Sequence, residues 1–149
     1  MNLTLEKYHS LSIGKQKEVQ IFLCELAYKK WLHYLTKNNI KTYVESVCGT
    51  KQKIDKNLPF DAIQAVKEKN YTTDISSRYL EPITAMQDLD LEFPNEIEFS
   101  YYCVYNLFEF YITKKEIDSC IIINQALSAL EKDEILDNLQ NAINHISIP

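Results

Sequence analysis

Three carboxylates stand at alternate positions in the middle of the chain, as Asp88, Asp90 and Glu92. This spacing resembles the opening of a calcium-binding loop, in which oxygen ligands occupy the first, third and fifth positions. The later positions do not fit that loop, because Phe93 stands where it requires Gly and Phe99 where it requires Glu. We therefore predict a solvated acidic loop or a protein-binding loop here, and no metal site.

A second candidate set lies on the aromatic segment that follows, residues 95–112. Its members recur at spacings of four, three and four and so share one face of a helix: Glu98, Tyr102, Tyr105 and Glu109. Tyrosine offers a large contact area at low entropic cost, and the carboxylates beside it would select a cationic surface. We predict that this face and the acidic loop before it bind a basic partner protein.

The same tyrosines have a structural alternative. Aromatic residues on helices belong to the core more often than to a binding surface. Tyr102 and Tyr105 would then pack against the amphipathic segment 72–87 and take no part in recognition. The sequence leaves both possibilities open.

Residues that could support catalysis or hold a metal ion are scattered. His9, His33 and His145 lie in separate segments, and none has a second ligand at metal-binding spacing. The four cysteines form no CxxC pair and predict reduced, buried thiols, except that Cys48 beside Gly49 is expected to be more exposed. No nucleophile has a recognisable base. We expect no catalytic residues, no metal and no cofactor, and a protein that is not an enzyme.

Helices must position the candidate residues. The 149 residues fit one domain, residues 1–149, and include only 2 Gly and 4 Pro, too few for a β-sandwich or a Gly-rich phosphate loop. Helical periodicity appears in seven segments: 15–37, 40–48, 57 or 58 to 69, 72–90 with a break at Pro82, 95–112, 114–131 and 133–146. Thr113 and Glu116 form the capping box that should open the sixth segment. The expected fold is an all-α, single-domain helical bundle of about six or seven helices.

The net charge of -5 is distributed unevenly along the chain. Residues 1–70 carry a net charge of +5 and residues 71–149 a net charge of -10. An acidic C-terminal half disfavours nucleic acid as its partner, because binding phosphates requires a basic surface. No segment has the roughly 18 apolar residues of a membrane span, and no leader is visible. We expect a cytoplasmic protein that binds neither nucleic acid nor membrane.

Two runs in the C-terminal half, EIEFSYYCVYNLF at 96–108 and IINQALSAL at 122–130, resemble a known class of protein. They look like the small all-helical immunity proteins that bacteria encode beside polymorphic or contact-dependent growth-inhibition toxins. The resemblance implies a cytoplasmic, non-catalytic protein that binds and blocks the toxic domain of a cognate toxin, often a nuclease. No functional residue is carried over by it.

Two other classes of function remain open. The chain could be a small helical regulator or scaffold subunit that binds a host protein, or an enzyme with an unrecognised helical active site. A toxin gene immediately upstream would separate an immunity protein from a regulator, and turnover by the isolated protein would support an enzyme.

Overall fold

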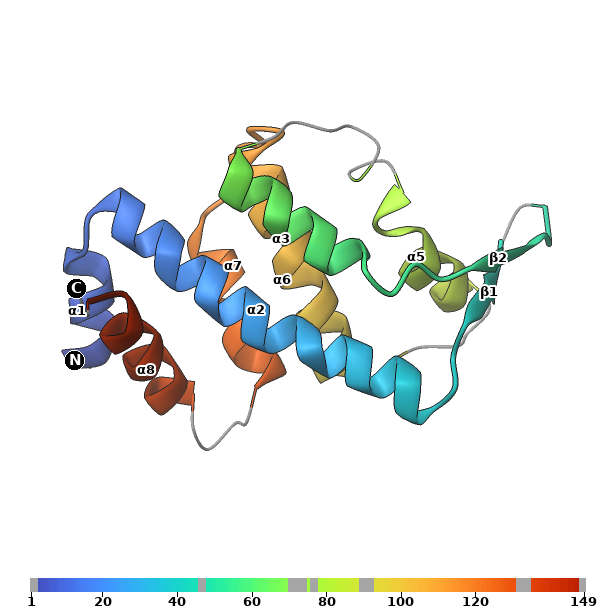
Figure 1. Ribbon diagram of the computed structural model, residues 1–149, viewed down its shortest axis with the longest axis horizontal. Helices are drawn as coiled ribbons and strands as arrows, with labels where there is room; N and C mark the ends of the chain where they lie inside the picture. The colour runs from blue at the N-terminus through green and yellow to red at the C-terminus, as the bar shows by residue number, and fades with distance from the viewer. Residues whose placement is uncertain are drawn as a thin grey trace.

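The computed structural model describes residues 3–45, 48–69, 75, 78–88, 93–130 and 135–147. These residues form seven helices and one short hairpin (Figure 1). In chain order the elements are α1 (Leu3–Ser10), α2 (Ile13–Lys37), β1 (Thr42–Val44), β2 (Lys51–Lys53), α3 (Leu58–Glu68), α5 (Glu81–Asp88), α6 (Asn95–Tyr111), α7 (Cys120–Ala129) and α8 (Ile135–Ser147). The prediction of an all-α fold with six or seven helices is confirmed.

Helix α2 is the central element and runs diagonally across the molecule (Figure 1). It begins where the Ser12 hydroxyl accepts a hydrogen bond from the Lys15 amide, and the chain leaves it at Asn39, which has a left-handed φ of 54°. Apolar side chains cover most of its circumference, so it packs against α3, α6, α7 and α8. Its fully buried side chains include Val19, Leu23, Ala27, Trp31 and Leu35.

Helix α6 supplies the aromatic part of the core. Four of its predicted inward positions are buried: Ile97, Tyr101, Val104 and Phe108. Trp31 of α2 lies edge-on against Tyr101, with 4.2 Å between ring centroids, and Phe93 lies 5.2 Å from Trp31. Because aromatic rings bury large apolar areas and prefer this edge-to-face arrangement, the cluster holds α2 and α6 together.

The predicted helix over 40–48 is wrong. Part of this segment is β1, which pairs antiparallel with β2 so that Tyr43 lies opposite Gln52. Thr42, Tyr43 and Val44 alternate exposed, buried and exposed, and two of them are β-branched, which favours a strand. Gly49 does have a positive φ of 68°, but it serves the hairpin connection and does not end a helix.

The predicted capping box is also wrong. Helix α7 begins at Cys120, well after Thr113, because the Thr113 hydroxyl bonds backwards to Glu109 of α6 and does not cap the next helix. Lys114 then adopts a left-handed φ of 61°. The carboxylate of Asp118 accepts a hydrogen bond from the Cys120 amide at 2.9 Å and so fixes the start of α7.

Two of the remaining helices lie close to their predicted bounds, and one helix was not predicted from the sequence. Helices α3 and α8 match their predictions, and α5 has Pro82 in its first turn, where proline is tolerated. Helix α1 was not predicted and packs against α8, where the Thr4 hydroxyl donates to Gln140 at 3.4 Å. Residues 70–74, 76–77 and 89–92 lie outside the described residues.

No helix in the described ranges combines the length and apolarity that would be needed to cross a membrane. The two chain ends lie near each other beside α1 and α8 (Figure 1).

The indole of Trp31 provides a test of the core. Its Nε1 is buried and has no hydrogen-bond partner among the described residues, and an unsatisfied buried N–H costs about 1–3 kcal/mol. Trp31→Phe removes this group and keeps a ring, so we expect it to lower the free energy of unfolding by less than about 2 kcal/mol. Trp31→Ala should lower it by about 3–5 kcal/mol. Urea denaturation of both variants measures the difference, and equal losses would contradict this account.

Candidate functional site

Glu98 and Tyr102, two of the four residues predicted on one face of α6, lie next to α5. The Gln87 side-chain amide of α5 donates to Glu98 Oε1 at 3.2 Å and to the Tyr102 hydroxyl oxygen at 3.4 Å. Burial is the main cause that raises the pKa of Tyr102, so the phenol stays neutral. Gln87 therefore fixes the positions of Glu98 and Tyr102 relative to each other, with both side chains partly accessible.

Tyr105 is held from the other side. Its ring lies 5.7 Å from that of Tyr79, at an interplanar angle of 33°. Burial, followed by the Glu109 carboxylate, raises the pKa of Tyr105. Both tyrosines thus contact segment 72–87, as the packing alternative required, yet each keeps part of its surface exposed. The contacts make them constrained aromatic side chains at the edge of the core.

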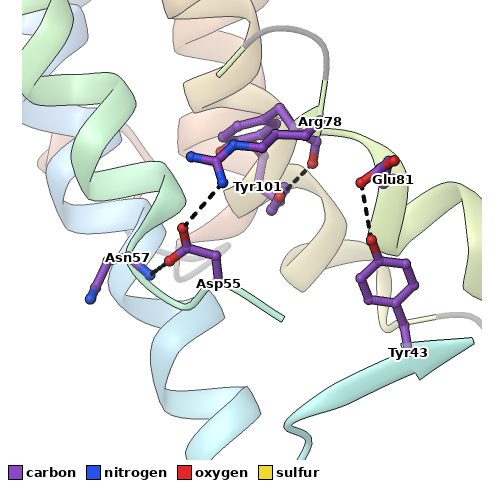
Figure 2. Close-up of polar contacts among 7 residues, drawn as sticks. Tyr43, Asp55, Asn57, Arg78, Glu81 and Tyr101 are labelled. Atoms are coloured by element: carbon purple, nitrogen blue, oxygen red, sulfur yellow. Dashed lines mark hydrogen bonds and ion pairs between the residues drawn. The ribbon is translucent and has the colours of Figure 1, made fainter. Parts of the chain in front are cut away.

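Tyr79 is in turn fixed by reciprocal hydrogen bonds. Its hydroxyl donates to the carbonyl oxygen of Tyr101 at 2.9 Å, and the Tyr101 hydroxyl donates to the carbonyl oxygen of Tyr79 (Figure 2). Both phenols are buried, and desolvation raises the pKa of each. Because two backbone carbonyls and two hydroxyls are satisfied together, the turn before α5 is attached firmly to the middle of α6.

Two further polar contacts attach the neighbouring loops to this region (Figure 2). The Tyr43 hydroxyl of the hairpin donates to Glu81 Oε2 of α5 at 3.0 Å. The Arg78 guanidinium lies 4.0 Å from Asp55, whose other carboxylate oxygen accepts a hydrogen bond from the Asn57 amide. These contacts link α5 to the hairpin, and they link the turn before α5 to the segment before α3.

Glu109 does not lie on the predicted binding face. Only 6% of its surface is exposed, and the Thr113 hydroxyl lies 2.6 Å from its Oε2 and 2.8 Å from its carbonyl oxygen. Helical spacing put this residue in line with Tyr105, but the chain that turns back after α6 covers it. Its carboxylate therefore organises the connection to α7 and is not available to a partner.

Phe99 adds an exposed aromatic ring beside Tyr102, at the opposite end of α6 from the buried Glu109. Of the surface of Phe99, 37% is exposed. It stands three residues before Tyr102, a spacing that brings their side chains together on a helix. We call Glu98, Phe99, Tyr102 and Tyr105 the acidic tyrosine face.

The acidic loop adjoins this face in sequence. Asp88 is the last residue of α5, but its side chain, like Asp90 and Glu92 as a whole, lies outside the described residues. The charge of the region follows from the sequence alone: residues 79–113 contain seven Asp or Glu and no Lys, Arg or His. Such a stretch produces a negative potential that favours a cationic partner.

The His, Cys, Asp and Glu side chains of the described ranges form no metal-binding cluster. No group of three or more His, Cys, Asp or Glu there could hold a metal ion. Cys24 and Cys103 are buried and Cys48 is exposed, as predicted, but Cys120 is only partly buried, contrary to the prediction. Burial raises the pKa of Cys24 well above its usual range, which is opposite to what a nucleophilic thiolate needs.

The Tyr43 contact predicts a stability difference that depends on pH. Burial, assisted by Glu81, raises the pKa of Tyr43 to about 12, above its value of about 10 in the unfolded chain. The stabilisation is therefore complete below pH 10 and is lost as the pH rises through about 12. We expect Tyr43→Phe to be less stable by about 1 kcal/mol at pH 8, with the difference shrinking above pH 10.

Urea denaturation of the two proteins between pH 8 and 11.5 measures this difference. The other tyrosines and the lysines are the same in both proteins, so subtraction isolates Tyr43. A difference that stayed constant over this range would show that the hydroxyl does not depend on Glu81 in the proposed way.

Comparisons with known proteins complete the description of this site. No protein-family model, no curated protein and no solved structure shows significant similarity to the chain. The surface and its charge are therefore the features that bear on function.

Proposed function

We propose that this chain is a non-catalytic, cytoplasmic immunity protein that binds and neutralises a cognate bacterial toxin domain, most simply a nuclease. The acidic tyrosine face and the adjoining acidic loop would form the binding surface. A nuclease must present a basic surface to grip phosphates, and an acidic partner can occupy that surface. The resemblance of the C-terminal half to immunity proteins supports the same assignment.

The observation that carries the proposal is the way two tyrosines are held beside a carboxylate. Gln87 fixes Tyr102 and Glu98, and Tyr79 fixes the ring of Tyr105. Side chains that are already ordered lose less conformational entropy when a partner binds. Partly exposed tyrosines with an acidic rim are therefore suited to act as anchors for a cationic protein surface.

The acidic loop should act through the rate of association. Reversing its three charges, with Asp88→Lys, Asp90→Lys and Glu92→Lys combined, should slow association with the partner isolated by pull-down by about tenfold at low salt. The matched control reverses three exposed carboxylates elsewhere: Glu6, Glu116 and Asp137. Surface plasmon resonance over a range of salt concentrations measures the rates. Equal slowing by both triple variants would exclude this loop as the specific rim of the interface.

The tyrosines should act through the rate of dissociation. Tyr102→Ala or Tyr105→Ala should speed release of the partner by about thirtyfold, which corresponds to a hot spot of about 2 kcal/mol. Circular dichroism and urea denaturation of each variant are the controls. Normal release by two folded variants would reject the surface, and loss of the fold would favour the packing alternative.

A further inference from the structure

Three lysines from distant parts of the chain converge at the opposite end of α6. Lys17 of α2, Lys69 after α3 and Lys114 after α6 line a hollow of about 450 Å³. Its remaining lining consists of Val66, Tyr111 and Ile112. This volume is within the range of pockets that bind small molecules. The three side chains come from three elements, so only the folded chain brings them together.

The charges of these lysines are not neutralised within the part of the chain that the structure describes. No carboxylate there lies at ion-pair distance from Lys17, Lys69 or Lys114. Desolvation, followed by repulsion from the other two ammonium groups, lowers the pKa of Lys17. The adjoining hollow shares Lys17 and Lys69, and its other two lysines, Lys15 and Lys67, are paired with Glu18 and Glu25.

The wall of the hollow is held in place from the core. Lys17 Nζ lies 4.7 Å from the centre of the Tyr111 ring, a cation–π contact. The Tyr111 hydroxyl donates to the buried Gln20 side chain, whose amide donates to the Tyr8 hydroxyl at 2.8 Å. This chain of hydrogen bonds fixes the ring and thereby limits the positions that Lys17 can take.

The other two lysines are set by an unusual backbone. Lys69 and Lys114 have φ angles of 59° and 61°, in the left-handed region that non-glycine residues seldom adopt. Among the described residues, Asn39 is the one other non-glycine residue with a positive φ. Lys69 is the left-handed C-cap that ends α3, and Lys114 follows the end of α6. Two helix ends therefore each contribute one lysine to the lining of the hollow.

We propose that this hollow is a binding site for a small phosphate-bearing anion, such as a diphosphate group. Three ammonium groups can neutralise its charges and donate hydrogen bonds to its oxygens. The apolar side chains and the Tyr111 ring leave room for an attached organic group. This site is separate from the acidic tyrosine face, since Tyr111 stands six residues after Tyr105, about 9 Å farther along α6 and about 120° round the helix.

The surroundings favour a small anion over a nucleic acid. Glu18 and Glu25 line the adjoining hollow, and Glu116 and Asp118 line a third hollow that shares Lys114. A nucleic acid needs an extended basic track for its regularly spaced phosphates. These carboxylates would repel such a strand on either side of the three lysines, whereas a compact anion avoids them.

Isothermal titration calorimetry with pyrophosphate tests the site. We expect saturable one-to-one binding by the wild-type protein at matched ionic strength. Lys69→Asn and Lys114→Asn should each weaken it about tenfold, since asparagine removes the charge and tolerates the left-handed backbone. The matched control is Lys37→Asn, an exposed lysine at the far end of α2, which should leave the affinity unchanged. Bound pyrophosphate should also raise the pKa of Lys17 in an NMR titration.

Parallel titrations identify the source of the phosphate. Tighter binding of ADP than of pyrophosphate would support the site and indicate a nucleotide, and equal affinity would support it and indicate the phosphate group alone. No saturable binding of either compound, or an equal loss in Lys37→Asn, would overturn the proposal. The proposal would also be overturned if a short DNA duplex bound more tightly than pyrophosphate and ADP and lost affinity in the Lys69→Asn and Lys114→Asn variants.

Discussion

The contact between Trp31 and Tyr101 joins the two long helices, and most of the other packing is arranged around it. From Tyr101 the contacts continue outward through Tyr79 to Tyr105, with 4.1 and 5.7 Å between successive ring centroids. The rings thus form a continuous path from the centre of the core to the acidic tyrosine face. A change in the core would be transmitted to that face, because close-packed interiors yield little to local strain.

The second organising feature is the separation of charge along α6. Glu96 and Glu98 lie in its first turn, and Lys114 and Lys115 follow its last. Both groups have the sign that stabilises the helix dipole, so the arrangement supports the helix itself. It also produces two surfaces of opposite charge at the two ends of one rigid element. Repulsion keeps a cationic partner away from one end and an anionic ligand away from the other.

The two proposed sites differ in how the structure prepares them. At the acidic tyrosine face, hydrogen bonds and ring contacts order aromatic side chains that stay partly exposed. At the lysine hollow, lysines from three separate elements line one cavity beside the Tyr111 ring, and no carboxylate among the described residues lies at ion-pair distance from them. In each case a buried side chain holds the site in place. This side chain is Tyr79 at the acidic tyrosine face and Gln20 at the lysine hollow.

Strong local patterns were enough to predict several elements from the sequence. The apolar positions of α2 and α6 repeat at helical spacing over many residues, and Pro59 marks the start of α3, so these helices and the all-α class could be recognised. Glu98, Tyr102 and Tyr105 were placed on a common face for the same reason. Periodicity of this length is a property of the chain itself and depends little on distant partners.

Tertiary structure decided the features for which a residue has two alternative partners or conformations. Thr113 could cap a following helix, but its hydroxyl donates to Glu109 instead. Tyr43 could belong to a helix, but pairing with β2 and its hydrogen bond to Glu81 favour a strand. The lysine hollow joins residues 17, 69 and 114, and the sequence indicated only that the N-terminal half, which contains the first two, is basic. Such contacts between distant segments have no local signature, because the free energy that selects them appears only when the chain has folded.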